Sequence, residues 1–354
     1  MTQKSQYSKI KRRYLKHIWF ARSTLLLAGV VGLYLLFLFI LWFVRVSPLG
    51  NLIEPAKNFI FAPSGQVLNT DGRTNVILLG RGGEGHEAPD LTDTIIFGSI
   101  STDKNSAIMV SLPRDIWSGS LKAKINSAYF FGKDKSGGDS KAGLILAKAT
   151  IEEILGVPIH YAVVLDFSGF KRIIDELGGV EVAVENSFTD QEYPIPGKEN
   201  DLCGGDPKYL CRYETVSFTQ GVQMMNGDTA LKFSRSRHAQ GDEGTDFARA
   251  ERQQKVIDGI KNKILSLGVI FSPEKINGLA KVVGGSIETD VSNEAGAVLA
   301  RRAFDARDNI NSYVLSEDFF VRPPISRLYQ NQYVFVPKSG DWKEIHSWIN
   351  SILP

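Results

Sequence analysis

The chain has few cysteines and histidines, residue types that often serve as nucleophiles and metal ligands. It contains two cysteines, Cys203 and Cys211, and five histidines in 354 residues. The histidines lack the spacing of metal ligands, and no serine or cysteine has the partners of a catalytic triad. These absences argue against a zinc protein and against an enzyme that works through a covalent nucleophile.

The two cysteines lie in ENDLCGGDPKYLCRYE, a segment whose Gly and Pro residues predict a loop. We predict that Cys203 and Cys211 form a disulfide, which for so short a loop stabilises by about 2 to 3 kcal/mol in the chain-entropy model. The alternative is a metal site with two thiolates. Two ligands are too few for such a site, and no histidine is adjacent.

The N-terminal region lacks acidic residues, and the segment after it lacks charge altogether. Residues 1–22 carry seven Lys or Arg, whereas residues 23–44 carry no charged side chain. At 1.5 Å per residue this apolar segment is roughly 33 Å long, enough to cross a hydrocarbon core of about 30 Å. The basic flank predicts a cytoplasmic N-terminus and an external main domain. A cleaved signal peptide is the alternative, but the apolar run is long and VSPLGN is a poor cleavage site.

The basic tail also explains the charge of the chain. Its seven positive charges exceed the formal net charge of +2, so the rest of the chain is net acidic. The basic excess is therefore a signal for membrane orientation, and nothing here predicts a nucleic-acid partner. An anionic ligand must be bound by a local cluster of basic side chains.

Apolar segments alternate between strand and helix lengths, which predicts a layered α/β sheet domain with helices on both faces. We expect five parts: a cytoplasmic tail (1–22), a transmembrane anchor (23–44), a spacer (45–73), a main domain (74–268) and a C-terminal α/β extension (269–354). The extension either completes the same core or forms a lobe of its own. Within the main domain the expected strands are 75–79, 94–101, 106–112, 160–166 and 180–184, and the expected helices are 141–156, 168–177, 226–233 and one from residue 246 onward.

The helix expected from residue 246 carries charges on its apolar face. At about 100° per residue, Asp246, Arg249 and Gln253 continue the stripe formed by Val256 and Ile260. Arg252 falls on the opposite face, where we expect solvent. Because burying unpaired charge costs several kcal/mol, the polar end of the stripe predicts a salt network or a bound polar ligand.

Other polar groups lie at predicted strand ends, where open α/β sheets usually bind ligands. Arg114 and Asp115 follow one strand, Asp93 begins another, and Lys124 and Asn126 lie in the next loop. Guanidinium groups bind phosphate oxygens in pairs, and carboxylates suit Mg²⁺. Together with Arg235, Arg237 and Arg249, this set predicts a site for a polyanion with a divalent metal.

These segments also resemble a known family. The ordered motifs LLG…TDT, SLPRD, KINSAY, LDFSGFKRIIDELGGVEV, MNGDTALKFSRSR and DFARAERQQ, between about residues 75 and 265, are similar to those of the LytR-CpsA-Psr family of cell-wall assembly proteins. The resemblance implies a phosphotransferase that moves a glycopolymer from an undecaprenyl pyrophosphate carrier to peptidoglycan. It also implies a prenyl chain held in an apolar tunnel between sheet and helices.

The resemblance assigns roles to individual residues. It implies that Asp93, Arg114, Arg235 and Arg249 act in catalysis and that Asp93 binds Mg²⁺. This chain has Gly80-Arg81-Gly82-Gly83 where the family has a further acid, so Asp90 or Glu84 would supply the second oxygen. The implied pyrophosphate-binding residues are Arg114, Lys124, Arg235, Arg237, Asp246, Arg249 and Gln253.

Three functions follow as hypotheses. The first is the membrane-anchored, magnesium-assisted transferase. The second is a protein that binds polyprenyl-pyrophosphate-linked glycan without chemistry, and the third is a pyrophosphatase acting on the same lipid. For the helix from residue 246, we expect Arg249→Ala to abolish lipid binding and Arg252→Ala to have little effect.

Overall fold

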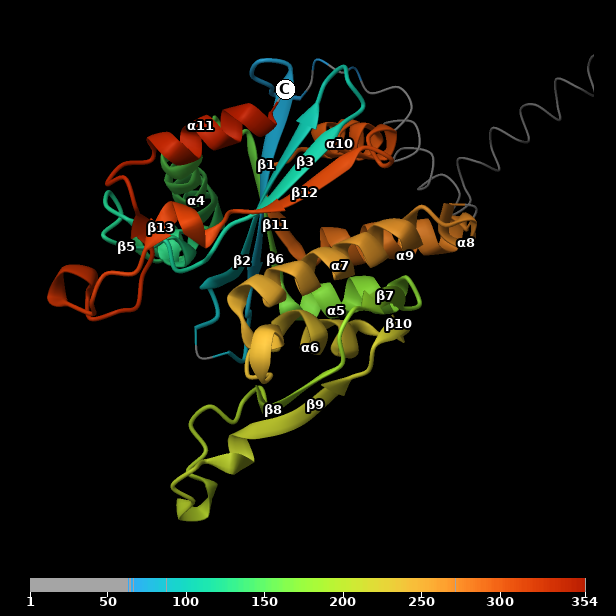
Figure 1. Ribbon diagram of the computed structural model, residues 1–354. Helices are drawn as coiled ribbons and strands as arrows, with labels where there is room; N and C mark the ends of the chain where they lie inside the picture. The colour runs from blue at the N-terminus through green and yellow to red at the C-terminus, as the bar shows by residue number, and fades with distance from the viewer. Residues whose placement is uncertain (1–62, 64, 66, 87, 271, 354) are drawn as a thin grey trace, which may run out of the picture. The chain divides into compact units, whose positions relative to one another are not determined.

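A mixed six-stranded sheet runs through the centre of the domain (Figure 1), in the order β11-β6-β1-β2-β3-β12. Its central strand β1 (Arg73–Arg81) is antiparallel to β2 (Thr92–Ser101) and parallel to β6 (Tyr161–Asp166). The apolar run of β1 is buried or half-buried throughout, as expected of a strand covered on both faces. The other strands of this sheet are β3 (Ala107–Ser111), β11 (Ile287–Thr289) and β12 (Ile310–Val314).

The structure is a computed structural model that describes residues 63, 65, 67–86, 88–270 and 272–353. The expected tail (1–22), the expected span (23–44) and most of the spacer lie outside the described residues. Within the part of the chain that is described, no helix is both long and apolar enough to cross a membrane.

Helices cover both faces of the sheet, which confirms the α/β class. The helix α4 (Ser140–Leu155) packs against one face together with α3 (Ala128–Lys135) and α11 (Lys343–Ile352), while α10 (Asn293–Asp305) packs near the other (Figure 1). Gly156 ends α4 with a φ of 70°, a conformation that favours glycine.

A second apolar core lies below the sheet in Figure 1, between α5 (Phe167–Glu176), α6 (Gly227–Arg235) and α7 (Asp246–Ile264). A Cβ on Gly227 would come within 2.4 Å of the Lys171 carbonyl oxygen, so α5 and α6 approach closely at a position that needs glycine. The N-cap of α5 is Asp166, which accepts a hydrogen bond from Gly169 N, so the helix begins one residue before the expected range of 168–177. The strands around this core are β7 (Val180–Val184), β8 (Phe188–Pro194), β9 (Tyr213–Phe218) and β10 (Gly221–Met225).

The C-terminal region completes the central sheet. Its strand β11 pairs with β6 and its strand β12 pairs with β3, so it supplies both edges. Of the two alternatives that the sequence leaves open, the structure therefore supports a shared core. The remaining elements are β4 (Trp117–Ser118), β5 (Ala123–Lys124), α8 (Leu267–Ile270), α9 (Pro273–Gly284), β13 (Phe320–Val321) and β14 (Val336–Pro337).

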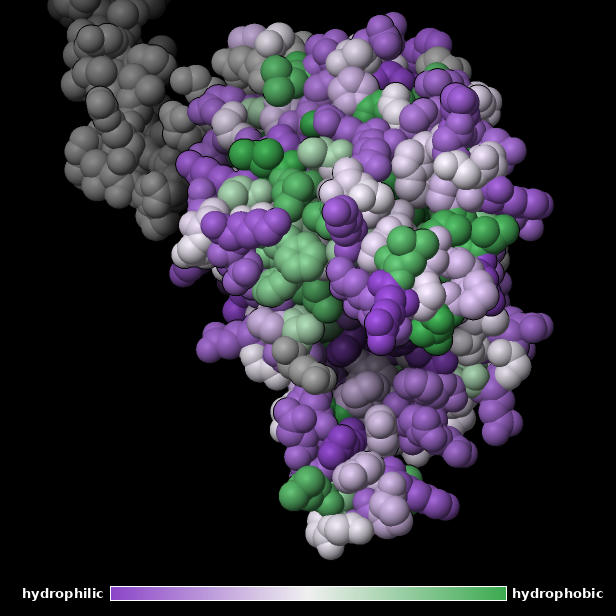
Figure 2. Space-filling view, turned by 90° about the vertical axis from the view of Figure 1, so that its left-hand side faces the viewer, coloured by the Kyte–Doolittle hydropathy of each residue, from purple (hydrophilic) through white to green (hydrophobic). Residues whose placement is uncertain are grey.

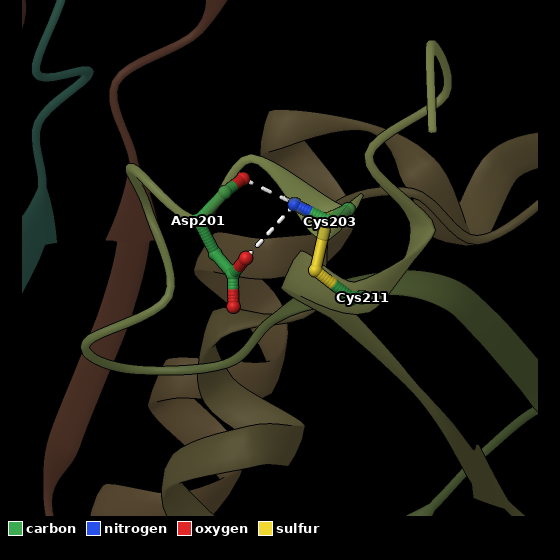
Figure 3. A group of neighbouring side chains, drawn as sticks. All are labelled: Asp201, Cys203 and Cys211. Carbon is green, nitrogen blue, oxygen red and sulfur yellow. Dashed lines mark hydrogen bonds between the residues drawn. A yellow bond between two sulfur atoms is a disulfide. The ribbon is translucent and has the colours of Figure 1, made fainter. Parts of the chain in front are cut away.

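The hairpin of β8 and β9 protrudes from the domain (Figure 1) and has a disulfide near its tip. Cys203 and Cys211 are bonded to each other, and Asp201 Oδ1 accepts a hydrogen bond of 2.8 Å from Cys203 N (Figure 3). The predicted disulfide is confirmed. Its sulfur atoms are therefore not thiolates available to a metal ion.

Candidate functional site

A line of alternating charges crosses the ends of β2 and β3. Asp93 on β2 pairs with Arg114, which follows β3, and Arg114 Nε lies 3.6 Å from Asp115 Oδ2. Lys124 Nζ then lies 2.6 Å from Asp115 Oδ1. The three segments that the sequence marked at strand ends therefore do come together in space.

A pocket lies between these charges and the N-terminal part of α7. Arg249 and Gln253, one helical turn apart, face Asp93 and Arg114 across it. Its inner wall is apolar, made by Ile95, Leu112, Val314, Leu315 and Phe335. The pocket thus has a polar side that suits an anion and an apolar wall that suits a hydrocarbon.

The orientation of α7 follows from its cap and its contacts. Thr245 accepts a hydrogen bond from Ala248 N and starts the helix, of which Asp246 is the first residue. Val256 is buried, and Gln254 Nε2 donates a hydrogen bond of 3.0 Å to Tyr313 O on β12. The helix is therefore attached to the sheet on the side where Arg249 meets the pocket.

Arg235 and Arg237 do not line this pocket. Arg235, the last residue of α6, lies with its guanidinium carbon 4.1 Å from the centre of the Phe167 ring and donates a hydrogen bond of 3.3 Å to Tyr193 Oη. Arg237 has an exposed side chain, and its backbone N donates to Asp190. Two of the four predicted arginines, Arg114 and Arg249, thus share one pocket.

The face seen in Figure 2 is hollowed above the protruding hairpin, between the hairpin and the body of the domain. Hydrophobic side chains gather in patches on the body above this hollow. A ligand with polar and apolar parts finds both kinds of surface on this face.

Asp90 lies apart from Asp93. Its carboxylate pairs with Arg81, and Lys133 Nζ lies 3.0 Å away. Arg81 also pairs with Glu288, which accepts a hydrogen bond from Tyr129. Burial, followed by this hydrogen bond, raises the pKa of Tyr129 well above its ordinary value. Asp90 is thus part of a structural network. Of the two predicted metal ligands, Asp93 lines the pocket and Asp90 does not.

Among the described residues, the one group of three possible metal ligands in mutual reach is Asp201, Cys203 and Cys211. The disulfide removes both thiolates from this group. Neither the tip of the hairpin nor the pocket therefore offers a site made of protein ligands alone in the described part of the chain.

The expectation for Arg252 is wrong. Its side chain is buried, with 2% of the residue exposed, and it does not face solvent. It donates hydrogen bonds to Phe233 O (3.0 Å), Ser236 O (2.6 Å) and the Glu243 side chain (2.8 Å). The chain segment between α6 and α7 folds over this face of α7, which no periodicity within α7 itself indicates.

Asp190 on β8 also binds the segment between α6 and α7 that Arg252 contacts. Its buried carboxylate accepts hydrogen bonds from Ser236 Oγ (2.6 Å), Arg237 N (2.9 Å) and His238 N (3.2 Å). Burial alone would raise the pKa of Asp190, but these hydrogen bonds lower it below its ordinary value. Arg252 and Asp190 together fix the loop that follows Arg235.

His86 is a residue near the site that the sequence did not mark. Its ring contacts Phe167 edge-on, with centroids 5.3 Å apart, on the same ring that Arg235 covers. Burial and then the charge of Arg235 lower the pKa of His86, while Glu199 and Asp93 raise it. The only sign of this residue in the sequence is the glycine-rich loop before it. Gly83 and Gly85 have positive φ values there, which let the chain turn after β1.

Known proteins resemble this chain over most of its length. It is 29% identical over 231 residues to the polyisoprenyl-teichoic acid–peptidoglycan teichoic acid transferase TagU of Enterococcus faecalis, a match that takes in 64% of each chain. It is 27% identical over 285 residues to TagU of Bacillus subtilis, covering 77% of this chain and 79% of that one. With the first of these relatives the match spans just under two thirds of the relative's length. The predicted enzyme class, a transferase, agrees with both names.

The fold is shared with solved structures as well. The crystal structure of B. subtilis TagV matches with a TM-score of 0.56 and 22% identity, over 80% of this chain and 98% of that chain. The sequence profile of the LytR_cpsA_psr family matches residues 52–349. The chain therefore belongs to the LytR-CpsA-Psr family, as the motifs in its sequence predict.

Proposed function

We propose that this protein is a membrane-anchored phosphotransferase that moves a glycopolymer from a polyprenyl pyrophosphate carrier to peptidoglycan. The observation that carries the proposal is the pocket in which Arg114, Arg249, Gln253 and Asp93 meet above an apolar wall. The names of the TagU relatives support the same reaction class, because they join a polyisoprenyl-linked polymer to peptidoglycan.

The pocket suits a pyrophosphate that carries a lipid. Guanidinium forks bind two phosphate oxygens at once, so Arg114 and Arg249 would hold the pyrophosphate from opposite sides. The first prenyl units would then lie on Leu112, Val314 and Leu315. Such apolar contact contributes about 25 cal/mol per Å² of buried surface, which explains why a lipid-linked donor would bind better than free pyrophosphate.

The reaction needs positive charge more than it needs a nucleophilic side chain. The hydroxyl oxygen of the acceptor forms a bond to the phosphorus that carries the glycopolymer. The bond from that phosphorus to the bridging oxygen breaks, polyprenyl phosphate leaves with the electron pair, and the hydroxyl proton is released to solvent. Negative charge grows on the bridging and outer oxygens, where Arg114 and Arg249 would stabilise it.

We include Mg²⁺ in the proposal as a cofactor held partly by the substrate. Mg²⁺ usually binds one or two carboxylates together with phosphate oxygens and water, and Asp93 offers one carboxylate in the pocket. When bound, the ion would neutralise charge on the phosphate oxygens. Asp90 does not fit this role because Arg81 and Lys133 already bind it.

Arg235, Arg237 and Lys124 would act at the rim of the pocket. Arg235 and Arg237 contact Tyr193 and Asp190 of the β8–β9 hairpin, and there they would meet the second phosphate or the first sugars of the polymer. Lys124 is tied to Asp115 and would act on the neighbouring side. Their contribution is positive potential rather than direct contact with the reacting phosphorus.

The proposed location is the outer face of the cell membrane, with residues 23–44 as the anchor and the N-terminus in the cytoplasm. The disulfide supports an external domain, because disulfides persist in oxidising compartments. Peptidoglycan and lipid-linked polymer would both be within reach of a domain at that surface.

The test uses the full chain in lipid nanodiscs with Mg²⁺, a polyprenyl-pyrophosphate-linked glycan and peptidoglycan oligomers. We expect a covalent product that contains both glycans, and a fall in rate of about 10²- to 10³-fold for Asp93→Asn. The matched control is Asp308→Asn, which changes a carboxyl that is 84% exposed and should leave the rate unchanged. Binding of the donor without any transfer would refute the transferase.

One observation favours a second function, a protein that binds the lipid-linked glycan without chemistry. Both predicted metal ligands are already paired with cations, Asp93 with Arg114 and Asp90 with Arg81. This function predicts tight donor binding that does not change when Mg²⁺ is removed. Release of phosphate without an acceptor would instead indicate the pyrophosphatase.

A further inference from the structure

A second pocket adjoins the candidate site on the far side of the Asp93–Arg114 pair. Both pockets are lined by Asp93, Arg114 and Asp115. Besides these three residues, Lys124 and two aliphatic side chains, its lining consists of uncharged polar and aromatic residues. We call it the amide groove after its carboxamides; the residues that define it are Asn126, Phe130, Phe131, Gln330 and Gln332. Apart from Asp93, Arg114 and Lys124, none of its lining residues has a role in the proposed donor site.

The amide groove is built from two distant parts of the chain that are firmly joined. Gln330 Nε2 donates a hydrogen bond of 2.9 Å to Lys122 O, and the rings of Tyr329 and Trp117 meet edge to face at 5.4 Å. Phe335 N also donates to Asp115 O at 2.9 Å. The C-terminal region thus forms one wall of the groove, and its backbone is hydrogen-bonded to the site residue Asp115.

The chemistry of its lining fits a sugar chain. Carboxamides both donate and accept hydrogen bonds, which matches the hydroxyl and acetamido groups of N-acetylated sugars. Phe130 is 36% exposed and lies against Phe131, with ring centroids 5.4 Å apart, so an apolar surface is open to the C–H face of a sugar ring. The two cations in the lining, Arg114 and Lys124, are each paired with a carboxylate, so the lining favours an uncharged glycan over a polyanion.

The position of the groove distinguishes the acceptor from the donor. In a phosphoryl transfer the attacking and leaving oxygens lie roughly in line, on opposite sides of the phosphorus. The apolar wall that would hold the leaving polyprenyl phosphate is in the first pocket, on the side of Leu112 and Leu315. An acceptor hydroxyl that attacks the phosphorus from the opposite side would therefore belong to a ligand bound in the amide groove.

We propose that the amide groove binds the acceptor, an uncharged glycan strand of N-acetylated sugars, and presents its hydroxyl to the pyrophosphate site. This deepens the proposed function and rests on it for the identity of the strand as peptidoglycan. The C-terminal region then contributes Gln330 and Gln332 to acceptor recognition, in addition to completing the sheet.

The binding test needs no donor and no turnover. The full chain in nanodiscs is titrated with the β-1,4-linked hexamer of N-acetylglucosamine, and the dissociation constant is measured by calorimetry or ligand-observed NMR. We expect Phe130→Ala and Gln332→Ala to weaken binding about fivefold to tenfold each, in line with the loss of one aromatic or polar contact. The melting temperature should not change, because both side chains are exposed.

The chain offers matched controls. Phe304 on α10 is exposed to the same extent as Phe130, 36%, and lies outside both pockets. Gln220 at the base of the hairpin is exposed like Gln332. Phe304→Ala and Gln220→Ala should leave binding of the hexamer unchanged.

The outcomes separate this proposal from the proposed function. No binding of the hexamer by the unaltered chain at millimolar concentration, or equal binding by the two groove variants, overturns the acceptor site. Weaker binding of the donor lipid in Phe130→Ala, with the hexamer unaffected, also overturns it, since the groove would then serve the donor. Binding that follows the prediction, without transfer from any donor, keeps the glycan site and refutes the transferase.

Discussion

Arg249 and Arg252 lie on different faces of α7, and both are largely buried. Arg249 faces a pocket whose opposite wall carries Asp93 and Arg114, whereas Arg252 faces backbone carbonyls and Glu243. The partners of Arg252 belong to the fold and are always present. Arg249 also contributes to the wall of a pocket that contains both polar and apolar groups. Burial of a charge therefore does not by itself identify a binding residue, and the surroundings of the charge must be considered as well.

Of the variants that test the difference between Arg249 and Arg252, Arg252→Ala is expected to have the largest effect. The change leaves the carbonyls of Phe233 and Ser236 and the Glu243 carboxylate without their donor in a buried place. We expect a loss of about 3 to 5 kcal/mol in the free energy of unfolding, measured by urea denaturation. Loss of lipid binding should follow from the disordered loop, and Arg252→Lys should restore part of the stability. An unfolding free energy equal to that of the unaltered chain would contradict the structural role.

Asp190→Asn is expected to destabilise the same loop that Arg252 stabilises. The Asp190 carboxylate accepts several buried hydrogen bonds, so the amide should cost about 2 kcal/mol near pH 7. Because the pKa of Asp190 is lowered in the folded state, its stabilisation is present above the ordinary pKa and is lost as the pH falls through the lowered value. The difference in stability between the two proteins should therefore shrink toward pH 3. A difference that is constant with pH would show that the charge is not what stabilises the loop.

On the pocket side, Arg249→Ala should act on binding more than on stability. Loss of one charged contact to pyrophosphate weakens the affinity for a polyprenyl pyrophosphate by about ten- to hundredfold. The free energy of unfolding should fall by clearly less than in Arg252→Ala. Titration of both variants with the same lipid in nanodiscs measures the first quantity and urea denaturation the second. Equal losses of stability in the two variants would remove the distinction between the two faces of α7.

The smallest expected effect concerns His86, beside Arg235. Burial and the charge of Arg235 lower its pKa, so the unfolded chain binds a proton more readily than the folded one as the pH drops below about 6.5. Stability is thus lost on the acid side, and His86→Gln should make the decline in melting temperature between pH 7.5 and 5.5 shallower. His238→Gln, at a more exposed histidine on the neighbouring loop, is the control. An unchanged slope would show that His86 is not in the field of Arg235.

Local patterns in the sequence predict much of the secondary structure and part of the candidate site. The strands that became β1, β2, β3, β6 and β7 and the helices α4 and α7 follow from apolar runs, glycines and caps, and the cluster of Asp93, Arg114 and Lys124 follows from their places at strand ends. Those features depend on neighbours in the sequence.

Features that depend on distant segments could not be predicted in this way. Arg252 appeared exposed because the helical period of α7 says nothing about the loop at Ser236 that covers it. Asp90 appeared free to bind a metal because Arg81 gives no sign, in the sequence, of reaching it. The amide groove needs Gln330 beside Asn126, and only the folded chain brings them together.

The strands β11 and β12 occupy the two outer edges of the central sheet, and both come from the last quarter of the chain. Until these strands have been synthesised, β6 and β3 each expose a row of unpaired backbone groups, which is a template for association with other chains. Completion of the sheet must therefore wait for nearly the entire polypeptide, and a chain that ends before Ile287 should aggregate rather than persist as a smaller enzyme.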